Sequence, residues 1–296
     1  MPVHEAFERE RDHLTRLAYR MLGVVADAED TVQDAYVRWL HAGEPELDAP
    51  RAWFTRTVTR LCVDRLRRDA RGPAYPGEWL PEPWIDPRAE QERLDETLSV
   101  ALLATIRRLA PRARAVFLLH DVFGYAFDEV AAMLDLKVDH CRQIASRARR
   151  DLRERPVTAP RDPAGERRIG EAFFSAIRDG ELDRLRDLLC DDVVMRSDGG
   201  GKVVAVPYPL HGKDRVVRFF DKIYRGIPEL QQLRIAACWA NGEPAFAMLT
   251  EDGIESWFTF VCVDGRIAEV LVQRNPDKLA RPADALFGRG RRDGLS

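Results

Sequence analysis

The sequence predicts a multidomain protein, with two all-α domains followed by an α+β domain shaped like a cone. The first 155 residues carry helical periodicity and no convincing strand, whereas five β-branched, partly alternating segments follow residue 165. Proline-rich stretches near residues 76–87 and 155–165 separate the three parts. At 296 residues and 45% apolar content, the chain is long enough to form several packed cores.

The predicted boundaries follow these changes in composition. They are a first helical domain 1–72, a linker 73–95, a second helical domain 96–155, a second linker 156–165, the α+β domain 166–282 and a tail 283–296.

Charge is distributed unevenly, although the formal net charge is only −3. Residues 1–50 hold five basic and eleven acidic residues, and residues 51–72 hold seven arginines against two aspartates. Residues 137–155 hold seven basic residues against three acidic ones. Two separate basic segments predict two separate contacts with phosphate.

Composition also argues against other classes of protein. No stretch approaches the ~20 apolar residues of a membrane span, and the acidic, helical N-terminus is unlike a secretory signal. The five cysteines have no CxxC pairing and apolar neighbours, which favours buried, reduced thiols. We therefore expect a cytoplasmic protein with no membrane contact, no metal and no cofactor.

The helix near residues 25–40 has one acidic face. Helical spacing brings Asp27, Asp30, Gln33 and Asp34 together, opposite an apolar stripe that includes Val32. Such a face suits a basic partner surface, and a solvated acidic face is the alternative.

The next helix, over residues 51–68, combines arginines with an aromatic residue. Phe54, Val58, Leu61 and Leu66 form its core stripe, and the opposite side carries Trp53, Arg56, Thr57, Arg60 and Arg67. Arginines neutralise phosphates and tryptophan stacks on bases, so this face suits single-stranded or melting DNA. A solvated arginine-rich helix is the alternative.

Two short helices, FDEVAAML and VDHCRQIASRARR, are separated by three residues and predict a helix-turn-helix. Asp135 takes the place of the glycine that is common in the turn. A simple structural helix pair is the alternative. The side chains expected to face outward, toward base edges, are Lys137, His140, Arg142, Gln143 and Arg147.

The third domain is expected to be a curved antiparallel sheet wrapped on helices, with hairpin turns at Asn241-Gly242 and Asp264-Gly265. Catalysis would need a buried acid or base, and no paired arrangement emerges. We therefore predict no catalytic residues, and leave open a small-molecule pocket. The groups considered are Asp198, His211, Asp214 and Glu255.

DAEDTVQDAYVRWL followed by AWFTRTVTRLCVDRLRR resembles region two of the bacterial extracytoplasmic-function sigma factors. The resemblance implies that the first helix docks on the clamp helices of the largest RNA polymerase subunit, through Asp27, Asp30, Gln33 and Asp34. It implies that the second helix reads and melts the minus-ten promoter element, through Trp53, Arg56, Thr57, Arg60 and Arg67.

LAPRARAVFLLHDVFGYAFDEVA with the following helix pair resembles sigma region four. That resemblance implies binding to the minus-35 element and to the polymerase β-flap tip. The contacts with DNA would come from Lys137, His140, Arg142, Gln143 and Arg147.

Three further motifs, WLPEP, DGGGK and NPDKL, match a subgroup of these sigma factors that carries a fused SnoaL-like domain. The resemblance implies that this domain replaces a separate anti-sigma factor and sits against the linker. The implied interdomain regulatory residues are Trp79, Leu80, Pro81, Glu82, Pro83, Asp198, Gly199, Gly200, Gly201, Lys202, Asn275, Pro276, Asp277, Lys278 and Leu279.

The linker sequence PGEWLPEPWIDP, residues 76–87, holds apolar side chains that a solvated spacer would not need. We expect Trp79 and Leu80 to pack near DGGGK, and Glu82 to pair with Lys202. The predicted function is a sigma factor that brings core RNA polymerase to promoter DNA and is regulated in cis. The alternative is a one-component DNA-binding regulator whose SnoaL-like domain binds a ligand or is weakly enzymatic.

Overall fold

The computed structural model describes residues 3–43, 49–85, 99–152, 162–226, 234–251 and 253–287. The chain divides into two compact units. One comprises Met1–Ala74 and Leu103–Arg155, and the other comprises Tyr75–Leu102 and Pro156–Ser296. The two predicted helical domains thus share one unit, while residues 75–85 of the predicted linker belong with the third domain.

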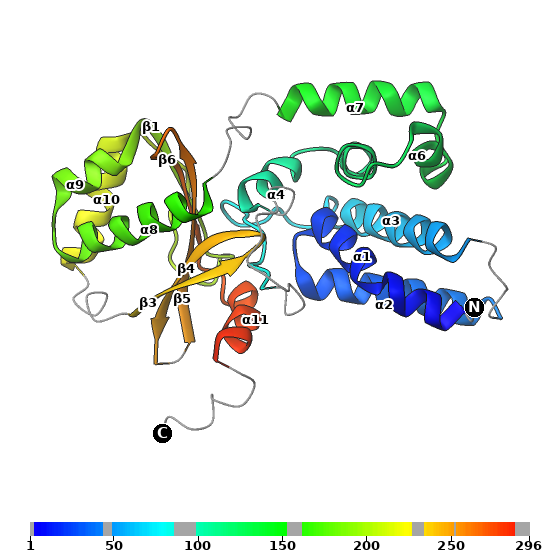
Figure 1. Ribbon diagram of the computed structural model, residues 1–296, viewed down its shortest axis with the longest axis horizontal. Coiled ribbons are helices and arrows are strands. Elements are labelled where there is room, and N and C mark those ends of the chain that lie inside the picture. Colours follow the sequence, from blue (N-terminus) through cyan, green and yellow to red (C-terminus); the bar gives the residue numbers. More distant parts are fainter. Residues whose placement is uncertain are drawn as a thin grey trace. The chain divides into compact units, whose positions relative to one another are not determined.

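The first unit is built from helices (Figure 1). They are α1 (Val3–Leu22), α2 (Val25–His41), α3 (Pro50–Asp69), α5 (Pro111–Phe117), the π-helical turn Leu118–Val122, α6 (Phe127–Leu134) and α7 (Val138–Leu152). Helix α4 (Val100–Ile106) carries the chain from the second unit back into the first.

Helices α1, α2 and α3 form a bundle around the predicted apolar stripes, with Phe7, Leu14 and Phe54 fully buried. The later helices pack directly on this bundle. The buried Arg114 of α5 donates from Nη1 to the carbonyl of Met21, at 2.6 Å, at the end of α1. Arg114 therefore joins the two halves of the unit.

The helix-turn-helix is confirmed in α6 and α7. Asp135 ends α6 with φ +57°, a left-handed conformation that aspartate tolerates better than most residues. This is why the turn forms without glycine. Val138 is half-buried, and the apolar residues of the pair that are buried include Val130, Ala131, Leu134, Cys141, Ala145 and Ala148.

The second unit contains a six-stranded sheet and four helices in its described part. The helices are α8 (Pro163–Arg178), α9 (Leu182–Leu188), α10 (Lys213–Gly226) and α11 (Pro276–Phe287). The strands are β1 (Leu189–Asp198), β2 (Leu210–His211), β3 (Arg234–Ala240), β4 (Glu243–Thr250), β5 (Gly253–Val263) and β6 (Arg266–Gln273).

The strand order is β2-β1-β6-β5-β4-β3, and β1 runs parallel to β6. The prediction of an antiparallel sheet is therefore wrong for this pair, although the other pairs are antiparallel. A tight hairpin fixes strand direction, as at Asn241-Gly242 and Asp264-Gly265. Between β1 and β6 lie α10 and four strands, so no local turn constrains their direction.

The sheet has two buried faces, because successive side chains of a strand point to opposite sides. On β5, Phe258 and Phe260 join the larger core with α8, α9 and α10. Trp257 of the same strand instead joins a smaller cluster with Leu279 of α11. Figure 1 shows α9 and α10 on one side of the strands and α11 on the other.

Helix α11 was not predicted, and it extends the domain beyond residue 282 to Phe287. The NPDKL motif starts this helix. The side-chain oxygen of Asn275 accepts the amide of Asp277 at 3.0 Å, which is an Asx turn.

Within the described ranges, no helix is both long and apolar enough to cross a membrane. The same residues contain no cluster of three or more histidine, cysteine or acidic side chains suited to a metal ion.

Candidate nucleic-acid interface and linker clamp

The acidic face of α2 presents three of its four predicted residues to solvent: Asp30, Gln33 and Asp34 are exposed. Asp27 is different, because it is half-buried and ion-paired with Arg65 of α3. Burial raises the pKa of Asp27, an effect that the Arg65 guanidinium opposes. Asp27 therefore braces α2 against α3.

The predicted DNA-facing side of α3 is accessible at Arg56 and Arg60. Trp53 is half-buried and meets Phe54 edge to face, with ring centroids 5.0 Å apart. The hydroxyl of Thr57 donates to the carbonyl of Trp53 at 2.8 Å. Arg67, farther along the helix, lies 3.7 Å from the carboxylate of Asp64.

Arg60 links this face to the helix-turn-helix. Its Nε donates to the carbonyl of Met133 in α6 at 3.0 Å. Helix α3, predicted to read one promoter element, thus contacts the motif predicted to read the other.

All five helix-turn-helix side chains predicted to face DNA are exposed, four of them on α7 and Lys137 in the turn before it. Arg142 pairs with Asp139 at 2.8 Å and lies 5.9 Å above the ring of Phe127. The ion pair with Asp139 orients the Arg142 guanidinium from within α7 itself. The other exposed residues are Lys137, His140, Gln143 and Arg147.

A buried carboxylate, Asp198 at the end of β1, holds the linker. Its Oδ2 accepts the amide of Leu80 at 2.9 Å, and its Oδ1 accepts the hydroxyl of Tyr75 at 2.7 Å. Lys278 of α11 lies 2.7 Å from the same carboxylate, in an ion pair that is almost completely buried. We call Asp198, Gln273, Asn275 and Lys278 the linker clamp.

Lys278 also contacts the linker directly. Its Nζ donates to the carbonyl of Leu80 at 2.7 Å and lies 4.7 Å from the ring centroid of Tyr75 and 4.4 Å from that of Trp79. Two aromatic faces thus stabilise the buried ammonium group by cation–π attraction. The residues predicted to anchor the linker do contact the third domain.

The side-chain amide of Gln273 donates hydrogen bonds to two carbonyls of the proline-rich linker. It donates to the carbonyls of Leu80 at 3.1 Å and Pro81 at 3.2 Å. Asn275 donates to the hydroxyl of Tyr75 at 3.0 Å. Because proline lacks an N–H, a proline-rich segment depends on side-chain donors of this kind when it is buried.

The glycines of DGGGK allow close packing, as expected. Gly200 and Gly201 have φ of +61° and +70°, which favour glycine. A Cβ at Gly201 would lie only 2.7 Å from Cγ of Pro76, and one at Gly200 would lie 2.3 Å from Asn275. The loop can therefore approach the linker only without side chains at these positions.

The predicted pair of Glu82 and Lys202 is wrong. Lys202 sits on the exposed loop and pairs with Asp277 at 2.7 Å. Glu82 is only 2% exposed, so its carboxylate lies away from that solvent-facing ion pair.

Several linker contacts were missed from the sequence. Asn241 exchanges hydrogen bonds with the backbone of Trp84, at 3.0 and 2.9 Å, and Glu243 accepts the amide of Val100 at 2.9 Å. The β3–β4 turn therefore holds the chain on both sides of residues 86–98. The Asn-Gly pair indicated a hairpin, and nothing in the local pattern marked Asn241 as a binding residue.

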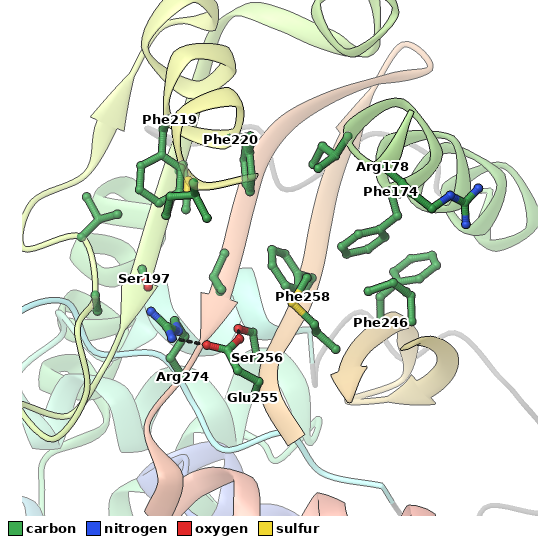
Figure 2. Close-up of a pocket in the computed structure, with 18 of the residues that line it drawn as sticks. Phe174, Arg178, Ser197, Phe219, Phe220, Phe246, Glu255, Ser256, Phe258 and Arg274 are labelled. Atoms are coloured by element: carbon green, nitrogen blue, oxygen red, sulfur yellow. Dashed lines mark hydrogen bonds and ion pairs between the residues drawn. The ribbon is translucent and has the colours of Figure 1, made fainter. Parts of the chain in front are cut away.

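On its other face the sheet forms part of a cavity of about 910 Å³ (Figure 2). Among the four acid–base candidates, Glu255 alone lines it, and it is ion-paired with Arg274. Asp198 faces the linker, His211 is exposed, and Asp214 pairs with Arg186, which lowers the pKa of that carboxyl. The structure does not bring these groups together.

His120 is a packed structural residue, and the cysteines are free thiols, as expected. His120 is packed at a helix end, with Nδ1 2.8 Å from the carbonyl of Tyr125 and its ring stacked on Phe127. All five cysteines are free thiols; Cys62 and Cys141 are buried and the other three half-buried. Burial raises the pKa of the Cys62 thiol.

Family models match all three parts of the chain. Sigma-70 region 2 matches residues 6–72, sigma-70 region 4 matches residues 99–152, and the SnoaL-like domain matches residues 171–270. The second of these matches begins near α4 and ends with α7.

Two relatives cover most or nearly all of the chain. It is 35% identical to the ECF RNA polymerase sigma factor SigJ of Mycobacterium tuberculosis, over 94% of this chain and 93% of that protein. It is also 35% identical to the probable ECF RNA polymerase sigma factor SigI of the same species, over 73% of this chain and 74% of that protein.

A solved structure agrees with these relatives. The crystal structure of M. tuberculosis SigJ superposes with a TM-score of 0.77 at 32% identity, covering 93% of this chain and 98% of that one. Sequence, fold and the order of the three parts agree, and the chain therefore belongs to the extracytoplasmic-function family of RNA polymerase sigma factors.

Proposed function

We propose that the chain directs core RNA polymerase to specific promoters and that its SnoaL-like domain regulates this activity in cis. The observation that carries the regulatory part is the buried linker clamp. It ties the segment between α3 and α4 to the third domain through Asp198, Gln273, Asn275 and Lys278.

The polymerase contact is assigned to the exposed face of α2, formed by Asp30, Gln33 and Asp34. Three hydrogen-bonding side chains, two of them carboxylates, suit a basic surface, such as the clamp helices of the largest polymerase subunit. Because Asp27 is occupied by Arg65, we assign it a supporting role. The helix-turn-helix half would meet the β-flap tip.

The promoter contacts are divided between two helices. Arg56, Arg60 and Trp53 of α3 would neutralise phosphate and stack on unpaired bases of the minus-ten element. Arg142 and Gln143, near the start of α7, would read base edges of the minus-35 element in the major groove. All of this is binding rather than catalysis, and it would take place in the cytoplasm with the polymerase.

The first unit has to open before it can bind both elements. The two elements lie about 25 base pairs apart, which is roughly 85 Å of duplex at about 3.4 Å per base pair. In the free chain, Arg60 of α3 is hydrogen-bonded to Met133 of α6. Helices in direct contact cannot span that distance, so the arrangement supports a closed, inactive state.

The third domain would restrain this opening through the connector, by which we mean residues 70–99 between α3 and α4. Residues 75–85 and the start of α4 are both held on the third domain, by the linker clamp and by the β3–β4 turn. With the linker still held, residues 70–74 alone separate the end of α3 from Tyr75, which is bonded to Asp198 of the third domain. Release of the linker clamp would therefore favour the open, promoter-binding state.

Run-off transcription with core polymerase tests the proposal. A sigma factor is required for promoter-specific transcript, so we expect transcript only when the chain is added. A one-component repressor would not be required, and transcript that forms equally without the chain would contradict the assignment. Breaking the linker clamp in the same assay tests the regulatory part.

A further inference from the structure

The cavity of the third domain has the size and lining of a small-molecule site. At about 910 Å³ it lies within the range of such sites, and it is enclosed by α8, α10 and one face of the sheet. Val204, which is 85% exposed, and Ile235, 37% exposed, also line it, and so mark where it meets solvent. Five phenylalanines form much of its wall: Phe174, Phe219, Phe220, Phe246 and Phe258.

One end of the cavity is polar. Glu255 accepts hydrogen bonds from the guanidinium of Arg274 and the hydroxyl of Ser256, and Ser197 lies nearby (Figure 2). At this end the carboxylate and guanidinium neutralise each other, so a charged ligand would meet one group of its own sign. The other charged residues of the lining are Glu171, Arg178 and Arg234. A neutral molecule with one hydroxyl, carbonyl or amine group suits this end better.

The polar end lies directly behind the linker clamp. On β1, Ser197 lines the cavity while the next residue, Asp198, holds the linker. After β6, Arg274 lines the cavity while Gln273 and Asn275, on either side, hold the linker. The alternation of side chains along a strand thus places the cavity and the linker on opposite faces of the same two strand ends.

Two hydrogen bonds of Arg274 join these faces. Its amide donates to the carbonyl of Asp198 at 2.7 Å, and its guanidinium donates to the carbonyl of Val204. Val204 belongs to the loop whose Gly201 packs on Pro76 of the linker. A contact that fixes Arg274 therefore also fixes the backbone of the linker clamp.

We propose that this cavity binds a neutral, largely apolar small molecule with one hydrogen-bonding group, and that its occupancy strengthens the hold of the linker clamp on residues 75–85. A ligand that orders the wall shared by the cavity and the linker clamp lowers the free-energy cost of ordering that wall when the linker is held. The coupling is reciprocal, so a held linker also favours ligand binding. The regulatory meaning of this coupling rests on the proposed function, but the binding and the coupling do not.

Binding is tested on the full chain with N-phenyl-1-naphthylamine, a neutral aromatic amine that fluoresces when it leaves water. We expect saturable binding with one site. Ala237→Trp, inside the cavity, and Ile235→Trp, at its margin, should weaken binding about tenfold or more by filling the space. Ala164→Trp, on the exposed first turn of α8, is the matched control and should bind like the native chain.

Because Ala237→Trp risks misfolding, the half-exposed Ile235→Trp decides the result if the first variant unfolds. Saturable binding that both folded variants retain unchanged would overturn the cavity assignment. Fluorescence that rises without saturation would overturn it as well.

Coupling is tested by hydrogen exchange of the full chain, followed in the peptide that covers residues 75–85. The amide of Leu80, bonded to Asp198, reports the linker clamp directly. At ten times Kd, complete coupling would slow exchange about elevenfold, and we expect at least about threefold. A peptide from α2 is the internal control. Unchanged or faster exchange with the probe bound would overturn the coupling.

These experiments involve no polymerase, so their failure is separable from that of the proposed function. If the probe protects the linker but clamp variants transcribe like the native chain, the regulatory proposal fails and the ligand site stands. If clamp variants change transcription but the probe leaves exchange unchanged, the coupling proposal fails and the regulatory proposal stands.

Discussion

At the scale of single residues, Asp198 is the centre of the linker clamp. Its carboxylate accepts hydrogen bonds from Tyr75, Leu80, Gln273 and Lys278, and it is fully buried. A buried carboxylate is tolerated only when its charge and lone pairs are satisfied. Asp198 therefore depends on both the linker and α11.

Removal of the Lys278 ammonium should destabilise the second unit strongly. Lys278→Met leaves the Asp198 carboxylate buried and uncompensated, at a cost of about 3–5 kcal/mol, whereas Asp198→Asn with Lys278→Met removes both charges and should recover much of the loss. Urea unfolding measures both. Lys202→Met breaks the exposed pair with Asp277 and should cost less than about 1 kcal/mol. Equal losses for Lys278→Met and Lys202→Met would contradict the buried role.

The acidic residues of α2 should act on polymerase without affecting the fold. Asp30→Ala with Asp34→Ala removes two exposed carboxylates, so we expect binding to core polymerase to weaken about tenfold or more at an unchanged melting temperature. Fluorescence anisotropy with core enzyme measures this. Asp183→Ala with Asp187→Ala, at the same spacing on exposed positions of α9, is the control. Native affinity in the α2 variant would exclude this face as the contact.

At the scale of elements, contacts between the two helical halves of the first unit decide its stability. Arg114 ties α5 to the end of α1, and Arg60 ties α3 to α6. His13 of α1 adds a contact with the hydroxyl of Tyr125 at 3.3 Å. These polar contacts join the two halves in the closed arrangement.

His13 should make this unit acid-sensitive. Burial, with Arg51 and Arg20 nearby, lowers the pKa of His13 below its ordinary value of 6.5, and Glu10 opposes the shift only in part. The native state therefore excludes a proton that the unfolded chain binds. Neutral His13 therefore contributes its full stabilisation of the native state above pH 6.5. That stabilisation is lost as the pH falls below this value.

Between about pH 7.5 and about pH 5.5, we expect the melting temperature of His13→Gln to fall less than that of the native chain. Thermal unfolding of the full chain at both pH values measures the difference. His140→Gln, at an exposed position of α7, should behave like the native chain. An identical acid-side loss in native and His13→Gln chains would rule out His13 as the cause.

The linker itself should become accessible when its anchors are removed. Trp79→Ala with Leu80→Ala removes the side chain stacked on Lys278 and a leucine that is only 1% exposed. Burial of two such groups contributes about 3–5 kcal/mol before ordering costs, so cleavage of residues 75–85 should speed up markedly. Limited proteolysis measures the rate. Unchanged cleavage would mean that the segment is only a stiff spacer.

The elements that the sequence predicted are those with a local signal. The apolar stripes of α1, α2 and α3, the helix pair α6–α7 and the Asn-Gly and Asp-Gly turns all depend on neighbours in the chain. The direction of β1 relative to β6 was mispredicted because it depends on a long crossover. Helix α11 was missed because its first residues form a turn.

The missed site residues share the same cause. Gln273 bonds to a linker carbonyl 193 residues away, and Arg196 pairs with Glu78 across 118 residues. Neither belongs to a motif, and only folding brings them to the linker. The predicted pair of Glu82 and Lys202 failed because composition does not reveal which charged side chain is buried.

At the scale of the whole molecule, division into two units does not follow the order of the chain. Regions two and four share one unit, and the segment between them belongs to the other. Under the proposed regulation, this segment would be the path by which the third domain acts on the promoter-binding helices. This is the central claim of the proposed regulation.

The measurement that tests this claim most directly is run-off transcription by core polymerase with the full chain, native or carrying Asp198→Asn and Lys278→Met. The double variant removes the buried ion pair of the linker clamp without leaving an unpaired charge. Lys202→Met with Asp277→Asn removes the exposed pair beside it and is the matched control. We predict more transcript from the clamp variant than from the native chain and the control. Equal transcript from all three, at equal protein stability, would contradict regulation through the linker.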